Sequence, residues 1–337
     1  MGLTIRQKLN FLTFMAIASA ILLIFTIAYV SYKDINRLNK VKELVLLSTK
    51  LSLLVHETQK ERGASAGYLG SKGKKFKTIL PNQRAKTDKR IKELNEFLNK
   101  INFNDYPDVL KKDVHDILNK LNMLQDIRNR VSSLNISAKE AINYYTGLNK
   151  DILDVIPLAA RLAKNEKIAK DLIAYSNFLQ AKERAGIERA VLTATFANKG
   201  FKNGMKSKEI QLIAEQNSYL NTFLSIANEE MKNYYKKISN SETFKTVQNL
   251  RNKALKSDFS VDSENWFKTI TEKINGLKQI DDFIASLTIS AIDEQIKTTK
   301  RNAFLYIVIL AIAAVVMVII VVTISRNINK NVNLLIT

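Results

Sequence analysis

Two long apolar segments, residues 11–30 and 303–324, flank a polar middle region, and they set the first limit on the fold. A helix needs about 20 apolar residues to cross the hydrocarbon core of a bilayer, and each segment has that length. The first segment is too long for a cleaved signal peptide and lacks the small-residue cleavage site. The sequence therefore predicts two transmembrane helices, over 9–31 and 303–325.

Two crossings place both chain ends on the same side of the membrane. The short ends are basic and carry no acidic residue, and their basic residues are Arg6, Lys8, Arg326 and Lys330. The positive-inside rule then favours cytoplasmic ends, with 1–8 as a cytoplasmic N-terminus. We expect residues 32–302 to form a sensor domain in the periplasm or outside the cell, attached to the inner (cytoplasmic) membrane. Because the chain ends soon after the second span, we expect an output domain beyond Thr337.

The chain is strongly basic, with 52 Lys and Arg against 32 Asp and Glu and a net charge of +20. Such a charge attracts anions, although the solvated helix faces of a Lys- and Asn-rich chain are the preferred explanation of the bulk charge. We expect no nucleic-acid partner, because no known motif occurs and the basic domain is expected to face away from the cytoplasm. The chain has no cysteine, and its two histidines are not at ligand spacing. We expect no metal site and no cofactor.

Apolar residues recur at steps of three and four over long stretches such as 41–55 and 110–124, which is typical of amphipathic helices. With three prolines and ten glycines, the chain has few interruptions. The predicted fold class is all-α, with antiparallel helices forming two stacked four-helix bundles or one eight-membered array. Pro157 should kink or split the fourth helix. The eight predicted helices cover 9–69, 77–101, 107–134, 138–164, 165–198, 204–238, 242–256 and 260–325.

Small residues interrupt the first helix where a neighbour or a ligand could approach closely. Gly63 and Gly67 lie beside Ala64, Ser65 and Ala66. Each glycine costs a helix about 1 kcal/mol relative to alanine, so a helix that keeps them has a reason to do so. The apolar stripe of this helix continues onto Arg62, where a core residue is expected.

A second segment, 180–192, echoes the first, because Lys-Glu-Arg occurs at 60–62 and again at 182–184. Here Arg189 lies on an apolar stripe, whereas Arg184 lies on a more mixed face. A buried arginine must be paired and hydrogen-bonded. An anionic ligand would satisfy both arginines, since two guanidinium forks suit a planar oxyanion. A structural ion pair is the other interpretation, with Glu61, Glu183 or Glu188 as the partner.

Residues 59–69 (QKERGASAGYL) and 183–192 (ERAGIERAVL) resemble the nitrate- and nitrite-sensing (NIT) domain family. The resemblance covers about residues 35–300 and implies an extracytoplasmic, all-helical domain of two stacked four-helix bundles. Such domains are attached to chemoreceptors, histidine kinases, cyclic-dinucleotide enzymes and RNA-binding antiterminators. Arginines from several helices hold the anion in the member that senses nitrate. This chain departs from that member, because its first segment has no adjacent pair of arginines.

By this match, the resemblance implies that Arg62 and Arg189 bind the ligand. The weaker candidates for the same role are Arg184, Gly63 and Lys60. The tail 324–335 resembles the opening of a HAMP linker, here 326–337, with Asn331 at the position of the usual proline.

The leading hypothesis from the sequence is a truncated transmembrane sensor, of the methyl-accepting chemotaxis type, for a small anion such as nitrate or nitrite. It would work as a homodimer and pass a helix shift to a missing output domain, which would engage cytoplasmic signalling proteins. The alternatives are the input of a histidine kinase and a ligand-free scaffolding bundle tethered to the membrane. We do not expect an enzyme, because the sequence offers no nucleophile–base pair, no metal cluster and no phosphate-binding loop.

Overall fold

The computed structural model describes residues 4–202 and 204–336, and within these ranges the regular structure is helical. Residues 1–3 of the predicted N-terminus and residue 337 of the HAMP-like linker lie outside the described residues. The chain divides into two units. One consists of Met1–Asn39 and Ile292–Thr337, and the other consists of Lys40–Ala291.

The first unit contains the apolar ends of the two longest helices, α1 (Ile5–Gly70) and α11 (Ser263–Ile336). Their most apolar windows have mean hydropathies of 2.5 and 3.5, and none of the residues in these windows is buried within the protein. Large apolar side chains such as Phe11 and Phe304 are more than half exposed, at 57% and 66%. By length and composition, both helices could cross a membrane.

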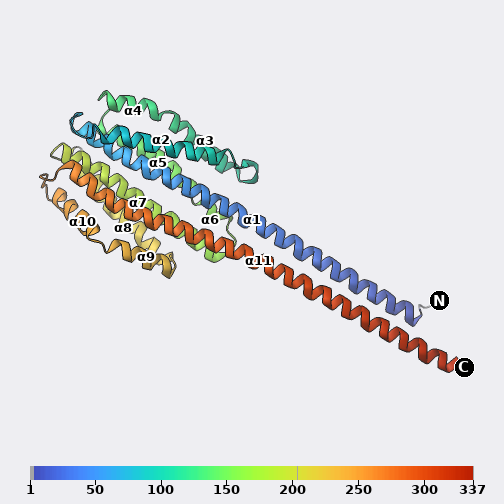
Figure 1. Ribbon diagram of the computed structural model, residues 1–337. Coiled ribbons are helices and arrows are strands. Elements are labelled where there is room, and N and C mark those ends of the chain that lie inside the picture. The colour runs from blue at the N-terminus through green and yellow to red at the C-terminus, as the bar shows by residue number, and fades with distance from the viewer. Residues whose placement is uncertain (1–3, 203, 337) are drawn as a thin grey trace. The chain divides into compact units, whose positions relative to one another are not determined.

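The second unit begins with a bundle of four helical layers. In chain order these are α1 from residue 40 onward, α2 (Ile79–Leu98), α3 (Asp108–Asn122) continued by α4 (Leu124–Ser132), and α5 (Ala138–Val155). A short 3₁₀ turn, η1 (Phe103–Asp105), precedes α3. Figure 1 shows α2, α4 and α5 running alongside α1 in this bundle.

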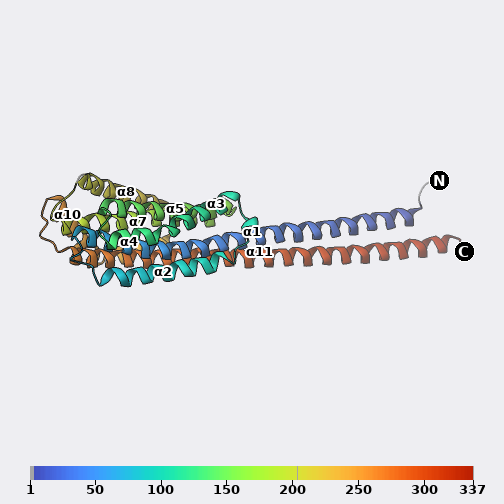
Figure 2. The ribbon, with the colours of Figure 1, turned by 90° about the horizontal axis from the view of Figure 1, so that it is seen from above.

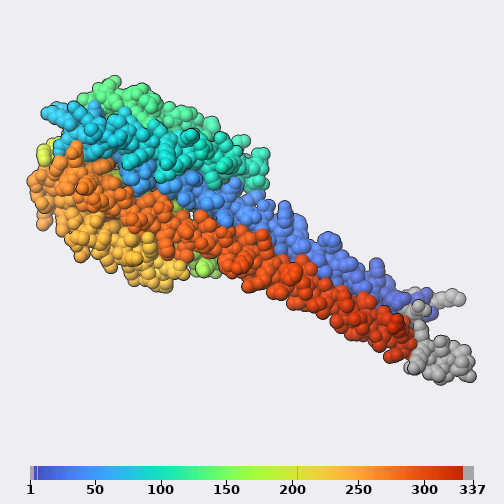
Figure 3. Space-filling model, viewed as in Figure 1, coloured from blue at the N-terminus to red at the C-terminus, as the bar shows by residue number. Residues whose placement is uncertain are grey.

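A second bundle repeats this arrangement after the short connecting helix α6 (Leu158–Leu162). Its layers are α7 (Glu166–Ala197), α8 (Met205–Ile226), α9 (Glu229–Ser239) continued by α10 (Glu242–Leu255), and the first part of α11. Figure 2 shows α5, α7 and α8 lying lengthwise beside one another, and the helix contacts agree. Figure 3 shows the green and cyan helices of the first bundle on one side of this unit and the yellow helices of the second on the other.

The predicted all-helical, antiparallel architecture of two four-helix bundles is confirmed, and the bundles pack side by side along their lengths. The split at Pro157 is also confirmed, because α5 ends at Val155 and α6 begins at Leu158. Two predicted helices are broken as well. A tight turn, in which the Met123 amide donates to the Lys120 carbonyl, ends α3, and the side chain of Asn228 caps a new helix, α9.

A buried polar network crosses the contact between α1, α7 and α11. The carboxylate of Asp281 accepts hydrogen bonds from Lys182 Nζ at 2.5 Å, from Tyr175 Oη at 2.8 Å and from Ser52 Oγ. Burial alone would raise the pKa of Asp281, but the ammonium groups of Lys182 and Lys278 lower it to about 2. The network therefore holds three helices together through one ionised carboxylate.

Candidate functional site

The contact between α1 and α7 is made by small residues, and each helix brings an arginine against a glycine of the other. A Cβ added to Gly63 of α1 would lie 3.3 Å from Arg189 Nε and 2.8 Å from the ring of Phe267. A Cβ added to Gly186 of α7 would lie 2.9 Å from Arg62 Nη2. The glycines thus allow both guanidinium groups to enter the interface between the two bundles.

Arg62 is fully buried, and only one nitrogen of its guanidinium, Nη1, donates hydrogen bonds. Its Nη1 donates to Glu183 Oε1 at 2.6 Å and to Thr146 Oγ1 at 3.0 Å. The other oxygen of Glu183 accepts from Gln59 Nε2 at 2.5 Å, which fixes the carboxylate. Nε and Nη2 of Arg62 have no hydrogen-bond partner. Of the carboxylates suggested by the sequence, Glu183 is the partner of Arg62.

Arg189 is also fully buried, and in the described residues no carboxylate lies within ion-pair distance of it. Its Nη1 donates to Thr271 Oγ1 at 2.9 Å, and its guanidinium lies 5.3 Å from the centre of the Phe267 ring. Nε and Nη2 have no partner. Burial, followed by the charge of Arg62, lowers the pKa of Arg189 to about 9.

The free edge is the same one in both arginines. Nε and Nη2 of a guanidinium point in parallel and form the fork that binds two oxygens of a planar oxyanion. Buried donors without acceptors are costly, and two matched forks at one interface are therefore a strong indication of a ligand. The two free forks supply the donors that a small planar anion requires.

An internal repeat generates this arrangement. In the first bundle Arg128 Nε and Nη2 donate to both oxygens of Glu61 at 2.7 and 2.9 Å. In the second bundle Arg251 does the same to Glu188 at 2.6 and 2.8 Å. Glu61-Arg62 therefore corresponds in structure to Glu188-Arg189, and not to Glu183-Arg184 as the repeated Lys-Glu-Arg suggested. The fourth layer of each bundle also supplies an equivalent threonine to the arginine.

The weaker candidates lie in different places. Arg184 is outside this interface, because its Nε donates to Glu215 at 2.8 Å and its guanidinium lies 4.6 Å from the centre of the Tyr219 ring. Lys60 is beside the interface and forms an ion pair of 3.4 Å with Glu57. Burial lowers the pKa of Lys60. Gly63 is in the interface and faces Arg189.

Sequence analysis did not identify the two threonines as part of the site. Thr146 lies outside the two segments that resemble the family, and Thr271 lies in a stretch without any motif. A comparison of the two halves aligned on Glu61-Arg62 and Glu188-Arg189 would have found them, because each threonine is in the last helix of its half.

The close packing at Gly186 has a measurable consequence. Gly186→Ala is expected to destabilise the protein by about 1–3 kcal/mol, because the new methyl group must displace Gln59 and Arg62 in a filled interface. The matched control is Gly147→Ala in α5, where an added Cβ meets only Lys120 Nζ, at 3.8 Å. That change should stabilise the protein by about 0.4–1 kcal/mol. Urea unfolding of both variants measures the difference, and equal effects would show that Gly186 is not constrained by its neighbours.

The family model described as nitrate and nitrite sensing matches residues 53–287, which include both arginines and both threonines. The chain belongs to the NIT family. The nitrate regulatory protein of Klebsiella oxytoca is 22% identical to this NIT chain over 262 residues. That match covers 77% of this chain and 65% of the relative, which is slightly less than two thirds of its length.

The structure of the NasR transcription antiterminator has the same fold as this NIT chain. The TM-score is 0.72 at 21% identity, over 86% of this chain and 82% of that one. The interpretation as a chemoreceptor of the methyl-accepting chemotaxis type is wrong, because the matching proteins are a nitrate regulatory protein and a transcription antiterminator. The expectation that nucleic acid is not a partner also conflicts with the similarity to a transcription antiterminator.

Proposed function

We propose that this domain binds nitrate or nitrite between Arg62 and Arg189 and is the ligand-sensing part of a nitrate-responsive regulator. The observation that carries the proposal is the pair of buried guanidinium forks with Nε and Nη2 free on both. The family description supports the ligand, and the similarity to a nitrate regulatory protein supports the regulatory role.

Charge at the interface suits a monovalent anion. Two guanidinium groups face one carboxylate, that of Glu183, while Glu57 and Lys60 compensate each other. One positive charge therefore remains, and nitrate or nitrite neutralises it. Sulfate would leave an uncompensated negative charge in a buried site, which is costly. Chloride has the right charge, but a sphere cannot engage two parallel N–H donors of each fork with separate oxygens.

Thermal unfolding of the full chain, purified in detergent, tests the proposal. Nitrate and nitrite should raise the melting temperature, with a stabilisation of about 2.7 kcal/mol at a hundredfold excess over the dissociation constant. Chloride and sulfate at the same ionic strength should not. An equal rise with all four salts would indicate general screening and would contradict a site selective for a planar, monovalent oxyanion.

The affinity for nitrate should depend on pH in one direction. Only the protonated guanidinium of Arg189 attracts the anion, and the pKa of this group is lowered to about 9. The affinity should be constant below that pKa and fall about tenfold per pH unit above it. Calorimetric titrations between about pH 7 and pH 10.5 measure this, with circular dichroism as the control for folding. A constant affinity over the whole range would show that Arg189 stays charged or does not bind the anion.

We further propose that the two apolar helix ends anchor the protein in a membrane as a two-pass protein, with residues 32–302 outside the cytoplasm. The chain has no cysteine, so single introduced cysteines can be labelled uniquely. A membrane-impermeant maleimide should label Lys92→Cys, whose side chain is 79% exposed, in intact cells. Thr4→Cys should be labelled only after lysis. The reverse pattern would overturn the orientation, and recovery of the protein without membranes would overturn the anchoring.

A further inference from the structure

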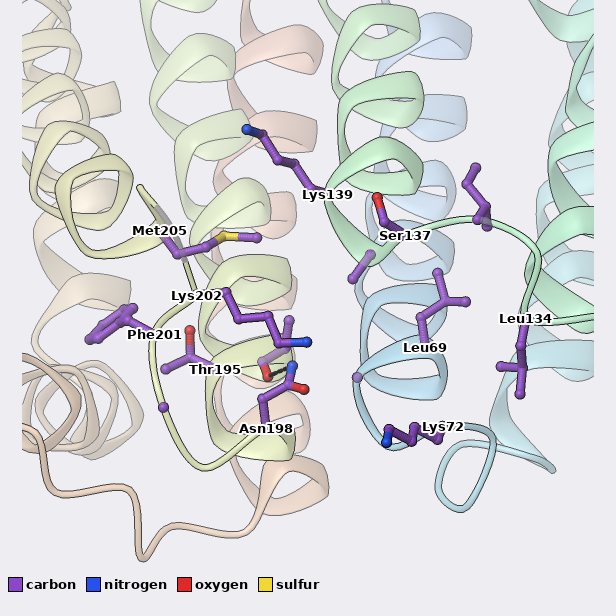
Figure 4. A pocket seen from close by; sticks show the side chains of 15 residues that line it. Leu69, Lys72, Leu134, Ser137, Lys139, Thr195, Asn198, Phe201, Lys202 and Met205 are labelled. Atoms are coloured by element: carbon purple, nitrogen blue, oxygen red, sulfur yellow. Dashed lines mark hydrogen bonds between the residues drawn. The ribbon is translucent and has the colours of Figure 1, made fainter.

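A separate cavity lies where three connections meet, away from the arginines. It has a volume of about 940 Å³ and is bordered by the end of α1, the start of α5 and the loop after α7. Figure 4 shows these three walls, with Leu69 and Lys72, Ser137 and Lys139, and Phe201 and Lys202 belonging to one wall each. Neither Arg62 nor Arg189 borders it. The cavity is much larger than nitrate needs, and it falls in the size range of sites for organic molecules.

The charges around this cavity are all positive. Each wall contributes one lysine, namely Lys72, Lys139 and Lys202, and no acidic residue borders the cavity. In the part of the chain that the structure describes, none of the three forms an ion pair. Figure 4 shows Lys72 and Lys202 extending toward each other from opposite walls.

The first turn of α5 adds to the positive electrostatic potential of the cavity. Its N-cap residue Ser137 and its first residues border the cavity, and the N-terminus of this 18-residue helix carries a partial positive charge. The carboxylate of Glu140 in that turn belongs to the N-cap, where it accepts a hydrogen bond from the Ser137 amide at 2.9 Å. It does not border the cavity.

The apolar part of the wall comes from Leu69, Leu134, Ile136, Phe201 and Met205, and Thr195 and Asn198 add polar side chains. An inorganic anion would leave the apolar side chains against water. We propose that the cavity binds an organic anion, with a carboxylate head between Lys72 and Lys202 and an aromatic or aliphatic body against the apolar side chains. The protein thus has a second ligand site, for a different class of anion from the one between the arginines.

Fluorine NMR on the full chain in detergent tests this with 4-fluorobenzoate as the probe. Its signal should broaden saturably, whereas the neutral analogue 4-fluorobenzamide controls for partition into micelles and should bind about tenfold more weakly or not at all. The triple variant K72Q/K139Q/K202Q should weaken benzoate binding about tenfold or more. The matched control K89Q/K111Q/K112Q removes the same charge from α2 and α3, outside the cavity, and should bind as the unmodified chain does.

A blocking variant tests the cavity itself. An added Cβ at Gly200, which borders the cavity, meets nothing within 4 Å, so Gly200→Trp can be accommodated and should exclude the probe. Arg189→Gln should leave benzoate binding unchanged, which separates this site from the proposed nitrate site. Absence of saturable binding to the unmodified chain at millimolar probe, equal weakening in both triple variants, or loss of binding in Arg189→Gln would each overturn the proposal.

Discussion

Replacement of Arg189 by glutamine is expected to abolish the nitrate-dependent rise in melting temperature while the nitrate-free protein stays folded. The guanidinium of Arg189 is fully buried without a carboxylate partner, and its pKa is lowered. Its buried charge therefore destabilises the nitrate-free fold, and the neutral amide of glutamine removes that cost, although the shorter side chain loses the hydrogen bond from Nη1 to Thr271. The fork that holds the anion, however, is lost. Differential scanning calorimetry with and without nitrate measures both effects.

The two arginines should differ in their effect on the fold. Arg62→Gln leaves the buried carboxylate of Glu183 without its cation, and the loss of one partner of a buried pair costs about 3–5 kcal/mol. Arg184→Gln is the matched control on α7, because Arg184 lies outside the interface and pairs with the partly exposed Glu215. That variant should respond to nitrate as the unmodified protein does. A full nitrate response in Arg189→Gln would refute the proposed site, even if Arg62→Gln fails to fold.

Asp281→Asn is expected to lower the free energy of unfolding by about 3–5 kcal/mol. The substitution leaves the ammonium of Lys182, 1% exposed, without a carboxylate, at the contact of α1, α7 and α11. Asp282→Asn is the control, because the Asp282 side chain is 56% exposed and its partner Lys278 keeps a second carboxylate, that of Asp281, 3.4 Å away. Denaturant unfolding compares the two. A cost below 1 kcal/mol for Asp281→Asn would show that the network does not hold the three helices together.

The same carboxylate should make part of the stability sensitive to acid. The pKa of Asp281 falls from its ordinary value of 3.8 to about 2 in the folded protein, so the folded state favours the ionised form. This contribution is present above pH 3.8 and is lost as the pH falls toward 2. The loss should be absent from Asp281→Asn, so the stabilities of the two proteins should converge in acid.

The sequence was sufficient to predict the helices, because the apolar period and the few breaking residues are local properties. The chain also breaks at Pro157, between α5 and α6, because proline lacks the backbone N–H that would continue the helix. The sequence also placed Arg62 and Arg189 on apolar stripes, and both are buried. A stripe gives the direction of a side chain relative to its own helix, which is enough to predict burial.

The partners of these side chains could not be predicted in the same way. Which residues meet across an interface depends on the rotation and axial offset of two helices, and no local pattern encodes either. The repeat of Lys60-Glu61-Arg62 at 182–184 does not reflect structural equivalence. The structural equivalent of Glu61-Arg62 is Glu188-Arg189, which follows an isoleucine instead of a lysine. The chemotaxis interpretation failed for a related reason, since a sensing domain does not specify the output that it controls.

The repeat of Glu-Arg in the two bundles means that each bundle carries half of the proposed anion site. A cut in the connection between α6 and α7 would yield two polypeptides, each a four-helix bundle presenting one fork. Neither half could chelate nitrate by itself, but an anion shared between them would fasten one to the other. The anion would then add to the contacts that already join the two pieces, namely the Arg62–Glu183 ion pair and the Asp281 network, and would strengthen their association.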